Sequence, residues 1–202
     1  MRVIVFGATG KTGRLVVRAA VDAGHEVTAF GRSVDRLDQA GIEIRRGDVF
    51  DAVSVADAVQ GQEAAIVCLG SVGLRDRSTL STGTASVVDA MVAHDVRRLV
   101  VMSAAGVGES WGQIPLTSKV LFRTLLRNVF ADHEAQEAVV GRSSLDWTIL
   151  RAGVLKDDPA VGSCELTNTG PITRITRADA ANCLVAQLDR TDVSGQAISV
   201  TN

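Results

Sequence analysis

Short apolar segments alternate with longer segments of helical periodicity along most of this chain. Short runs rich in valine, isoleucine and leucine, bounded by glycine or polar residues, predict buried strands. These runs lie at residues 3–6, 27–30, 42–44, 64–69, 99–103 and 147–151. Helical patterns separate most of them, at residues 15–23, 53–59 and 80–93. Such alternation implies right-handed crossovers, so we expect an α/β fold in which a doubly wound parallel sheet lies between two helical layers in a single domain.

The chain departs from this alternation after the fifth strand. Residues 106–115 contain three glycines and have the composition of a loop, and residues 116–130 have helical spacing. Residues 106–130 are a candidate for a lid over the carboxyl ends of the strands. The rest of the chain completes the fold with short strands at residues 164–167 and 197–200 and a helix between them at residues 177–188.

Three basic residues recur at intervals of four within residues 116–130, namely Lys119, Arg123 and Arg127. On a helix this spacing places them on one face, which in most proteins is simply solvated. The alternative is that this face belongs to the lid. Lys119 or Arg123 would then meet an anionic substrate, and Trp111 would help to form an open pocket in which a planar substrate stacks.

Three glycines follow the first strand in the sequence Gly7-Ala8-Thr9-Gly10-Lys11-Thr12-Gly13, and a helical pattern follows them. Glycine lets a backbone turn tightly and lets a pyrophosphate approach, and the free N–H groups at a helix start favour an anion. In the order strand, glycine turn and helix, the pattern predicts a dinucleotide-binding site. The alternative is an ordinary turn, because the spacing G-x-x-G-x-x-G differs from the G-x-G-x-x-G of many dehydrogenases.

The residues after the second strand predict which dinucleotide is bound. An NAD-selective site usually holds the ribose 2′-hydroxyl with an acidic residue here, and this chain has Gly31 and Arg32 instead. A guanidinium suits a 2′-phosphate, Ser33 adds a hydroxyl, and Lys11 and Arg36 add positive charge. We therefore expect NADP in preference to NAD. The alternative is that Arg32 merely faces solvent.

The ends of the other strands supply further candidate residues, because ligands of an open parallel sheet bind outside the carboxyl ends of its strands. After the third strand, Asp48 and Val49 are candidates for the adenine edge, with a helix N-cap as the alternative for Asp48. After the fourth strand the backbone would pass the ribose, and after the fifth and sixth it would flank the nicotinamide. The residues at these three places are Leu69, Gly70 and Ser71, then Ser103 and Ala104, and finally Gly153 and Val154.

Composition argues against several other classes of protein. The formal net charge of -2 gives no reason to expect nucleic acid or an anionic membrane as partner. No apolar run approaches the ~18 residues that a membrane span needs, and we see no signal-peptide pattern. The three cysteines and three histidines share no metal-ligand spacing, so we expect reduced cysteines and no metal. We expect a cytoplasmic monomer or weak homodimer with a small-molecule partner.

Four segments carry a resemblance to a known family. They are the glycine turn at residues 7–13, Gly47-Asp48-Val49, Leu145–Gly153 and Ile175–Asp179. Together they resemble the atypical short-chain dehydrogenases/reductases, in particular the NAD(P)H-binding proteins of the biliverdin-IXβ reductase and flavin reductase type. The resemblance covers nearly the whole chain and implies a single NAD(P)-binding Rossmann domain over residues 1–202. It also implies an NADPH-dependent reductase that transfers hydride to a conjugated acceptor such as a flavin, a quinone-like ring or a bilin.

The same resemblance implies which residues form the cofactor site. They follow the carboxyl ends of the predicted strands. The set is Gly7, Thr9, Gly10, Lys11, Thr12, Gly13, Arg32, Ser33, Arg36, Asp48, Val49, Leu69, Gly70, Ser103, Gly153 and Val154.

The chain contains no tyrosine, so it lacks the Tyr-x-x-x-Lys pair with which ordinary short-chain dehydrogenases donate a proton. By spacing, His133 stands where the lysine would be, and the family's substrate-side serine falls near Ser103 or Ala104. We take Ser103 and His133 as candidate catalytic residues, and Trp111 and Lys119 as candidate substrate contacts. The alternative for His133 is a partly exposed helical residue without a role in the reaction.

Two other functions are compatible with the same residues. Atypical relatives resembling the nitrogen-metabolite repressor family bind a dinucleotide and contact a partner without turnover. Other proteins on this scaffold are tailoring reductases of secondary metabolism. The small size of the chain favours the reductase over the regulatory protein.

Overall fold

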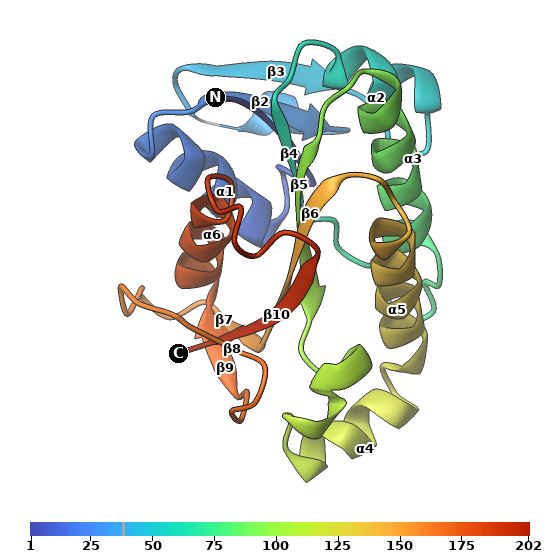
Figure 1. Cartoon of the computed structure of the whole chain (residues 1–202), viewed down its shortest axis with the longest axis vertical. Helices are drawn as coiled ribbons and strands as arrows, with labels where there is room; N and C mark the ends of the chain where they lie inside the picture. Colours follow the sequence, from blue (N-terminus) through green and yellow to red (C-terminus); the bar gives the residue numbers. More distant parts are fainter. Residues whose placement is uncertain (38) are drawn as a thin grey trace.

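The structure, a computed structural model, describes residues 1–37 and 39–202 and their side chains, apart from the side chain of Arg36. Its centre is an eight-stranded sheet in the order β3-β2-β1-β4-β5-β6-β10-β8 (Figure 1). Neighbouring strands are parallel, except that β8 runs antiparallel to β10. The strands are β1 (Arg2–Phe6), β2 (Glu26–Gly31), β3 (Ile42–Arg46), β4 (Ala64–Val67), β5 (Arg98–Ala104), β6 (Asp146–Ala152), β8 (Glu165–Thr167) and β10 (Gln196–Thr201).

Helices cover both faces of this sheet (Figure 1). On one face α1 (Lys11–Asp22) and α6 (Arg177–Ala186) pack against each other. On the other lie α2 (Ala52–Val59), α3 (Thr79–Ala93) and α5 (Arg127–Gly141). The expected doubly wound fold with three layers is therefore confirmed. Within the described residues, no helix is both long enough and apolar enough to cross a membrane.

The central strands are apolar on both faces, which explains why they are continuous apolar runs in the sequence. In β1, Val3 and Val5 belong to the buried cluster under α1 and α6, whereas Ile4 and Phe6 belong to the cluster under α2 and α3. β1 pairs with β2 on one side and β4 on the other, so the order of the strands reverses between β1 and β4. Such a reversal leaves a crevice at the carboxyl ends of the strands.

The prediction of one helix over residues 116–130 is wrong. α4 (Leu116–Thr124) ends where the Leu126 amide donates to the carbonyl of Leu121, and α5 begins at Arg127. The apolar side chains of α4 do not form a buried face, since Leu116 is 76% exposed and Val120 is 63% exposed. The helical spacing of these residues therefore marked a helix, but it did not mark a helix packed against the sheet.

Two short elements and most of α5 lie outside the predictions. β7 (Val154–Lys156) and β9 (Arg174–Thr176) form a separate parallel pair of three residues each, too short to show a period in the sequence. α5 continues to Gly141, and its buried side chains include the polar Asp132 and Gln136. Because these positions are polar, the inward face of α5 has no apolar stripe that a sequence pattern would reveal.

The two edges of the sheet differ from its centre. The edge strand β3 carries charged and exposed side chains, among them Glu43, Arg45 and Arg46, and the Arg45 guanidinium lies 2.7 Å from the Glu43 carboxylate. At the other edge, β8 has three residues and pairs with the end of β10.

Candidate cofactor and substrate site

A cleft of about 610 Å³ opens at the carboxyl ends of β1, β4 and β5, where the order of the strands reverses. Turns after several parallel strands line it, so segments far apart in the sequence meet here. Both candidate catalytic residues, Ser103 and His133, lie in its wall. So do most residues predicted for the cofactor, namely Gly7, Thr9, Gly10, Lys11, Thr12, Arg32, Asp48, Val49, Leu69, Gly70, Ser71, Ala104 and Gly153.

The glycine turn after β1 forms the part of the wall next to α1. Gly7 has a φ of 78°, and a Cβ there would lie 2.4 Å from the carbonyl oxygen of Cys68. A Cβ on Gly13 would lie 2.1 Å from the carbonyl oxygen of Gly7. Gly10 differs, because its φ of -68° suits any residue and its Cβ would meet only the Gly7 oxygen, at 3.3 Å. Gly7 and Gly13 are therefore needed because a side chain at either position would collide with the backbone of the turn, whereas Gly10 keeps the space before the helix open.

Two cations beside the start of α1 share one carboxylate. Nζ of Lys11 donates to one oxygen of Asp157 at 2.9 Å, and Nε of Arg177 donates to the other at 2.7 Å. Arg177 also donates to the Thr12 hydroxyl at 3.4 Å and lines the cleft. The hydrogen bonds from Lys11 and Arg177 hold the pKa of Asp157 below its ordinary value. An anion therefore already lies between these cations, beside a helix N-terminus that has no side-chain cap.

Arg32 lies in the cleft wall after β2, and 70% of its side chain is exposed. Its Nη1 lies 3.9 Å from Oδ2 of Asp48, which follows β3. The two residues therefore form one charged corner of the cleft. The side chain of Arg36, the other arginine predicted for this corner, lies outside the described part of the structure.

The prediction that Asp48 caps a helix is wrong. Its Oδ1 accepts a hydrogen bond from the Phe50 amide at 3.2 Å, which closes a turn and leaves Oδ2 toward Arg32. The N-cap of α2 is Asp51, whose side chain accepts from the Val53 amide at 3.1 Å. Asp48 is therefore part of the cleft wall and does not cap the helix.

The loop after β4 is held by its own hydrogen bonds. The Ser71 hydroxyl donates to the carbonyl of Gly73 at 2.9 Å, and the Asp76 carboxylate accepts from the Val72 amide at 2.8 Å. Hydrogen bonds from Thr79 and Val72 keep the pKa of Asp76 well below its ordinary value. Ser71 therefore faces the cleft from an ordered loop, with its proton already engaged.

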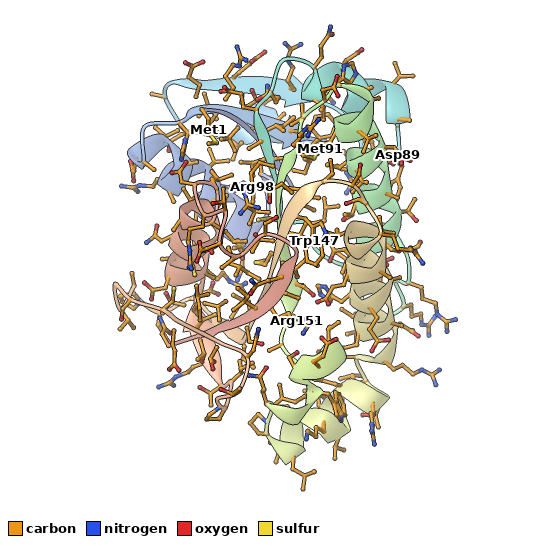
Figure 2. All side chains as sticks on the ribbon, viewed as in Figure 1. Met1, Asp89, Met91, Arg98, Trp147 and Arg151 are labelled. Carbon is orange, nitrogen blue, oxygen red and sulfur yellow. The ribbon has the colours of Figure 1, made fainter. Side chains whose placement is uncertain are left out.

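The other end of the cleft contains a buried ion pair behind Ser103. The Ser103 hydroxyl donates to Oε1 of Glu137 at 2.6 Å, and Ser103 is only 3% exposed. Both oxygens of Glu137 accept from Arg151: Nε donates to Oε1 at 3.1 Å and to Oε2 at 3.2 Å, and Nη2 donates to Oε2 at 2.7 Å. Arg151 lies on β6 (Figure 2), and its Nη2 also lies 2.9 Å from the exposed carboxylate of Glu109, which belongs to the segment after β5. Burial alone would lower the pKa of Arg151, but the contacts with Glu137 outweigh it and raise the pKa.

His133 belongs to a hydrogen-bonded group that joins α5 to α3. Its Nδ1 lies 3.3 Å from Oε1 of Gln136, and Nε2 of Gln136 donates to the Thr84 hydroxyl at 2.9 Å. Desolvation by burial lowers the pKa of His133 more than its polar neighbours raise it, so the imidazole is neutral at pH 7. The adjacent Asp132 is fully buried and accepts from the amides of Leu80 and Ser81, so it caps α3 from a different helix.

Cys68 also lies in the cleft wall, at the end of β4. Burial raises the pKa of its thiol to about 12, so it is neutral at pH 7 and is not a nucleophile there. Among the described residues, no three His, Cys, Asp or Glu side chains gather in a way that could hold a metal ion.

Three residues predicted for the cofactor lie outside the cleft wall. Gly13 lies under the turn, where it lets α1 approach Gly7. Ser33 is exposed at the start of a short 3-10 helix and makes no side-chain cap. Val154 is 49% exposed on β7, and the neighbouring Leu155 lines the cleft instead. The alternation of side chains along a strand explains why Val154 points away.

Trp111 and Lys119 also lie outside the cleft. Trp111 lines a separate pocket of about 430 Å³ together with Phe122, Arg123 and Phe130. The guanidinium carbon of Arg123 lies 4.9 Å from the centroid of the Trp111 ring, and Nζ of Lys119 lies 5.8 Å from it. Two cations therefore lie close to the tryptophan ring, and the pocket that the ring lines is separate from the cleft.

Sequence reasoning assigned no role to Arg177, Asp157 or Glu137. Each acts through a contact with a residue far away in the chain, such as the 165 positions between Arg177 and Thr12. One signal was available for Glu137, because the charged Arg151 directly follows the apolar Ile149 and Leu150 and therefore requires a buried partner. The sequence did not say which carboxylate that partner would be.

Comparison with known proteins agrees with this geometry. The profile of a family described as NAD(P)H-binding matches residues 7–191. A protein of Arabidopsis thaliana described as uncharacterized and chloroplastic is 30% identical over 176 residues, which are 80% of this chain and 62% of that protein. This chain therefore spans less than two thirds of that relative's length.

Two solved structures have the same fold. ChuY, described as an anaerobilin reductase from Escherichia coli O157:H7, has a TM-score of 0.83 at 24% identity, with 100% of this chain and 97% of that chain covered. A short-chain dehydrogenase/reductase from Veillonella parvula in complex with NADP has a TM-score of 0.82 at 23% identity, with 100% and 94% covered. The glycine turn, the cleft at the strand reversal and the matching profile lead to one conclusion: this chain belongs to the NAD(P)H-binding family.

Proposed function

We propose that the protein is an NADPH-dependent reductase that transfers hydride to a conjugated acceptor such as a flavin, a quinone-like ring or a bilin. One observation carries this proposal. A single cleft joins the charged corner at Arg32 to a wall at Ser103 and His133, and the glycine turn lies between them. The names of relatives that are reductases support the reaction class, as does the NADP complex of a protein with this fold.

The residues of the cleft fit a dinucleotide. The space in front of Gly10 would be narrowed by a side chain, and α1 offers free N–H groups there. Lys11 and Arg177 supply two cations at this point, and the Asp157 carboxylate that they bind has the charge of a phosphate oxygen. We infer that the pyrophosphate takes over these contacts from Asp157.

NADPH, when bound, supplies the hydride, and the chain itself positions the reactants. Ser103 and His133 would flank the nicotinamide, and the neutral thiol of Cys68 excludes thiolate chemistry beside it. The chain contains no tyrosine, so the proton donor of ordinary short-chain dehydrogenases is missing. A conjugated acceptor tolerates this, because incoming charge spreads over its ring and positioning matters more than acid catalysis.

Steady-state oxidation of NADPH tests this function. We expect turnover with riboflavin, FMN, biliverdin or a naphthoquinone, and a rate at least ~100-fold lower with an isolated ketone, whose alkoxide needs a general acid. NADH and a no-acceptor reaction serve as controls. Comparable rates with ketones would show that the site contains an efficient acid and would contradict the proposal.

A second candidate function is a cofactor-sensing protein that binds NADPH and contacts a partner without turnover. The exposed apolar side chains of α4, which include Leu116, Val120 and Leu125, favour it because they offer a surface for another protein. Tight NADPH binding without turnover of any conjugated acceptor would support this function over the reductase.

Arg32 is expected to select the phosphorylated cofactor. Arg32→Asp should weaken NADPH binding by roughly ten- to a hundred-fold and NADH binding much less, because an anion then replaces the cation facing the 2′-phosphate. Calorimetric titration of both cofactors measures the difference. Arg18→Asp, an equal change of charge on the exposed side of α1, is the matched control. Equal losses for NADPH and NADH would show that Arg32 does not discriminate between them.

A further inference from the structure

The hydrogen bond between Ser103 and Glu137 determines whether the Ser103 hydroxyl can donate or accept a hydrogen bond in the cleft. The Ser103 hydroxyl lies 2.6 Å from Oε1 of Glu137. A carboxylate can only accept hydrogen bonds, so the serine must donate its single proton to Glu137. The lone pairs of the Ser103 oxygen then remain for whatever occupies the cleft beside it.

The surroundings of Glu137 hold its two oxygens as hydrogen-bond acceptors. Arg151 meets both of its oxygens, and the two side chains are only 7% and 10% exposed. A guanidinium can only donate hydrogen bonds, so both Glu137 oxygens act as acceptors toward it, whatever ligand is bound. Arg151 lies on β6, which pairs with β5 and β10, and Glu137 lies on α5, which packs against α3, so both residues of the pair come from packed elements.

His133, like Ser103, offers a hydrogen-bond acceptor to the cleft. Gln136 donates from Nε2 to Thr84, so its Oε1 is the atom that faces His133 and accepts from Nδ1. A neutral imidazole with its proton on Nδ1 has a lone pair on Nε2. No described residue forms a hydrogen bond with that nitrogen. Ser103 and His133 therefore both offer hydrogen-bond acceptors.

We propose that this end of the cleft recognises hydrogen-bond donors, so that the preferred acceptor of hydride is a conjugated heterocycle with N–H groups at its rim, such as an imide or lactam. A quinone, which carries only carbonyl acceptors, is disfavoured. This inference rests on the proposed reductase function. In it Glu137 is a positioning residue that acts through Ser103, and Ser103 does not donate a proton to the substrate.

Glu137→Gln tests the direction of the hydrogen bond. Oε2 of Glu137 accepts from both Nε and Nη2 of Arg151, whereas Oε1 accepts from Nε alone and from Ser103. We therefore expect the glutamine oxygen to take the place of Oε2, so that its amide N–H faces Ser103 and turns the serine proton into the cleft. The measured quantities are the dissociation constants of riboflavin, which has an imide N–H, and of menadione, which has none, for the protein saturated with NADP⁺. We expect the wild type to prefer riboflavin. The ratio of the two constants should shift toward menadione by about ten-fold in the variant, equivalent to about 1.4 kcal/mol.

Glu109→Gln is the matched control, because Glu109 also pairs with Arg151 but lies 89% exposed and does not touch Ser103. It should leave the ratio unchanged. Ser103→Ala removes the acceptor without disturbing the ion pair, so it should weaken the binding of riboflavin and leave the binding of menadione nearly unaffected. This variant tests the inference independently if Glu137→Gln does not fold.

The outcomes separate this inference from the proposed function. An unchanged ratio in both Glu137→Gln and Ser103→Ala, or failure of the wild type to prefer riboflavin, would overturn the inference even if NADPH is oxidised rapidly. The shift in the ratio without any turnover would support donor recognition and contradict the reductase. In turnover experiments the inference predicts that these variants raise KM for riboflavin and leave kcat unchanged.

Discussion

Replacing Gly10 with valine is expected to abolish dinucleotide binding and to leave the protein folded. The φ of Gly10 is -68° and its Cβ would meet one backbone oxygen, that of Gly7, at 3.3 Å, so we expect a small shift of the turn to accommodate a side chain there. The branched side chain would fill the space in front of the α1 N–H groups, where a pyrophosphate has to lie. We expect NADPH affinity to fall at least ~100-fold in a calorimetric titration, with an unchanged circular dichroism spectrum.

Gly13→Ala is the contrasting variant at the same turn. Its Cβ would lie 2.1 Å from the carbonyl oxygen of Gly7, so we expect loss of stability in place of selective loss of binding. Thermal unfolding separates the two effects. If Gly10→Val bound NADPH as tightly as the wild type, the turn after β1 would not be the phosphate site.

Asp132→Ala is expected to cause the largest loss of stability among the polar substitutions. The Asp132 carboxylate is fully buried and accepts from the Leu80 amide at 2.8 Å, the Ser81 amide at 3.0 Å and the Ser81 hydroxyl at 2.6 Å. Its removal leaves buried donors at the start of α3 without partners. We expect the free energy of unfolding to fall by about 2–3 kcal/mol, measured by urea denaturation.

Asp51→Ala is the matched control for this prediction. Asp51 caps α2 in the ordinary local way and is exposed, so water can replace the lost contact and the cost should be about 1 kcal/mol. Asp132→Asn, which keeps an acceptor oxygen, should fall between the wild type and Asp132→Ala. Equal losses for Asp51→Ala and Asp132→Ala would show that the link between α5 and α3 adds nothing beyond local capping.

Local features of the sequence predicted the layers of the fold and much of the cleft wall. Continuous apolar runs such as residues 3–6 mark strands buried on both faces, and the glycine turn follows the first of them directly. Residues such as Arg32, Asp48 and Ser103 follow from the same rule, because the carboxyl ends of parallel strands lie along one edge of the sheet.

The residues that sequence reasoning missed depend on contacts between distant segments. Glu137 lies 34 positions from Ser103, and Asp157 lies 146 positions from Lys11. No spacing rule links such positions. The prediction of one buried helix over residues 116–130 was wrong for a related reason. Helical periodicity identifies an apolar stripe, but it does not identify the part of the protein that packs against that stripe. The buried polar residues of α5 lack even that stripe.

The charged edge strand β3 and the three-residue β8 have a consequence for self-association. An exposed edge of unpaired N–H and C=O groups invites strand addition by another chain, which leads to aggregation. The charged side chains of β3, Glu43, Arg45 and Arg46, oppose such docking, and β8 offers too few groups to template it. Colloidal stability of this protein is therefore expected to depend on the charges of β3, so neutralising that strand would remove the barrier to sheet extension.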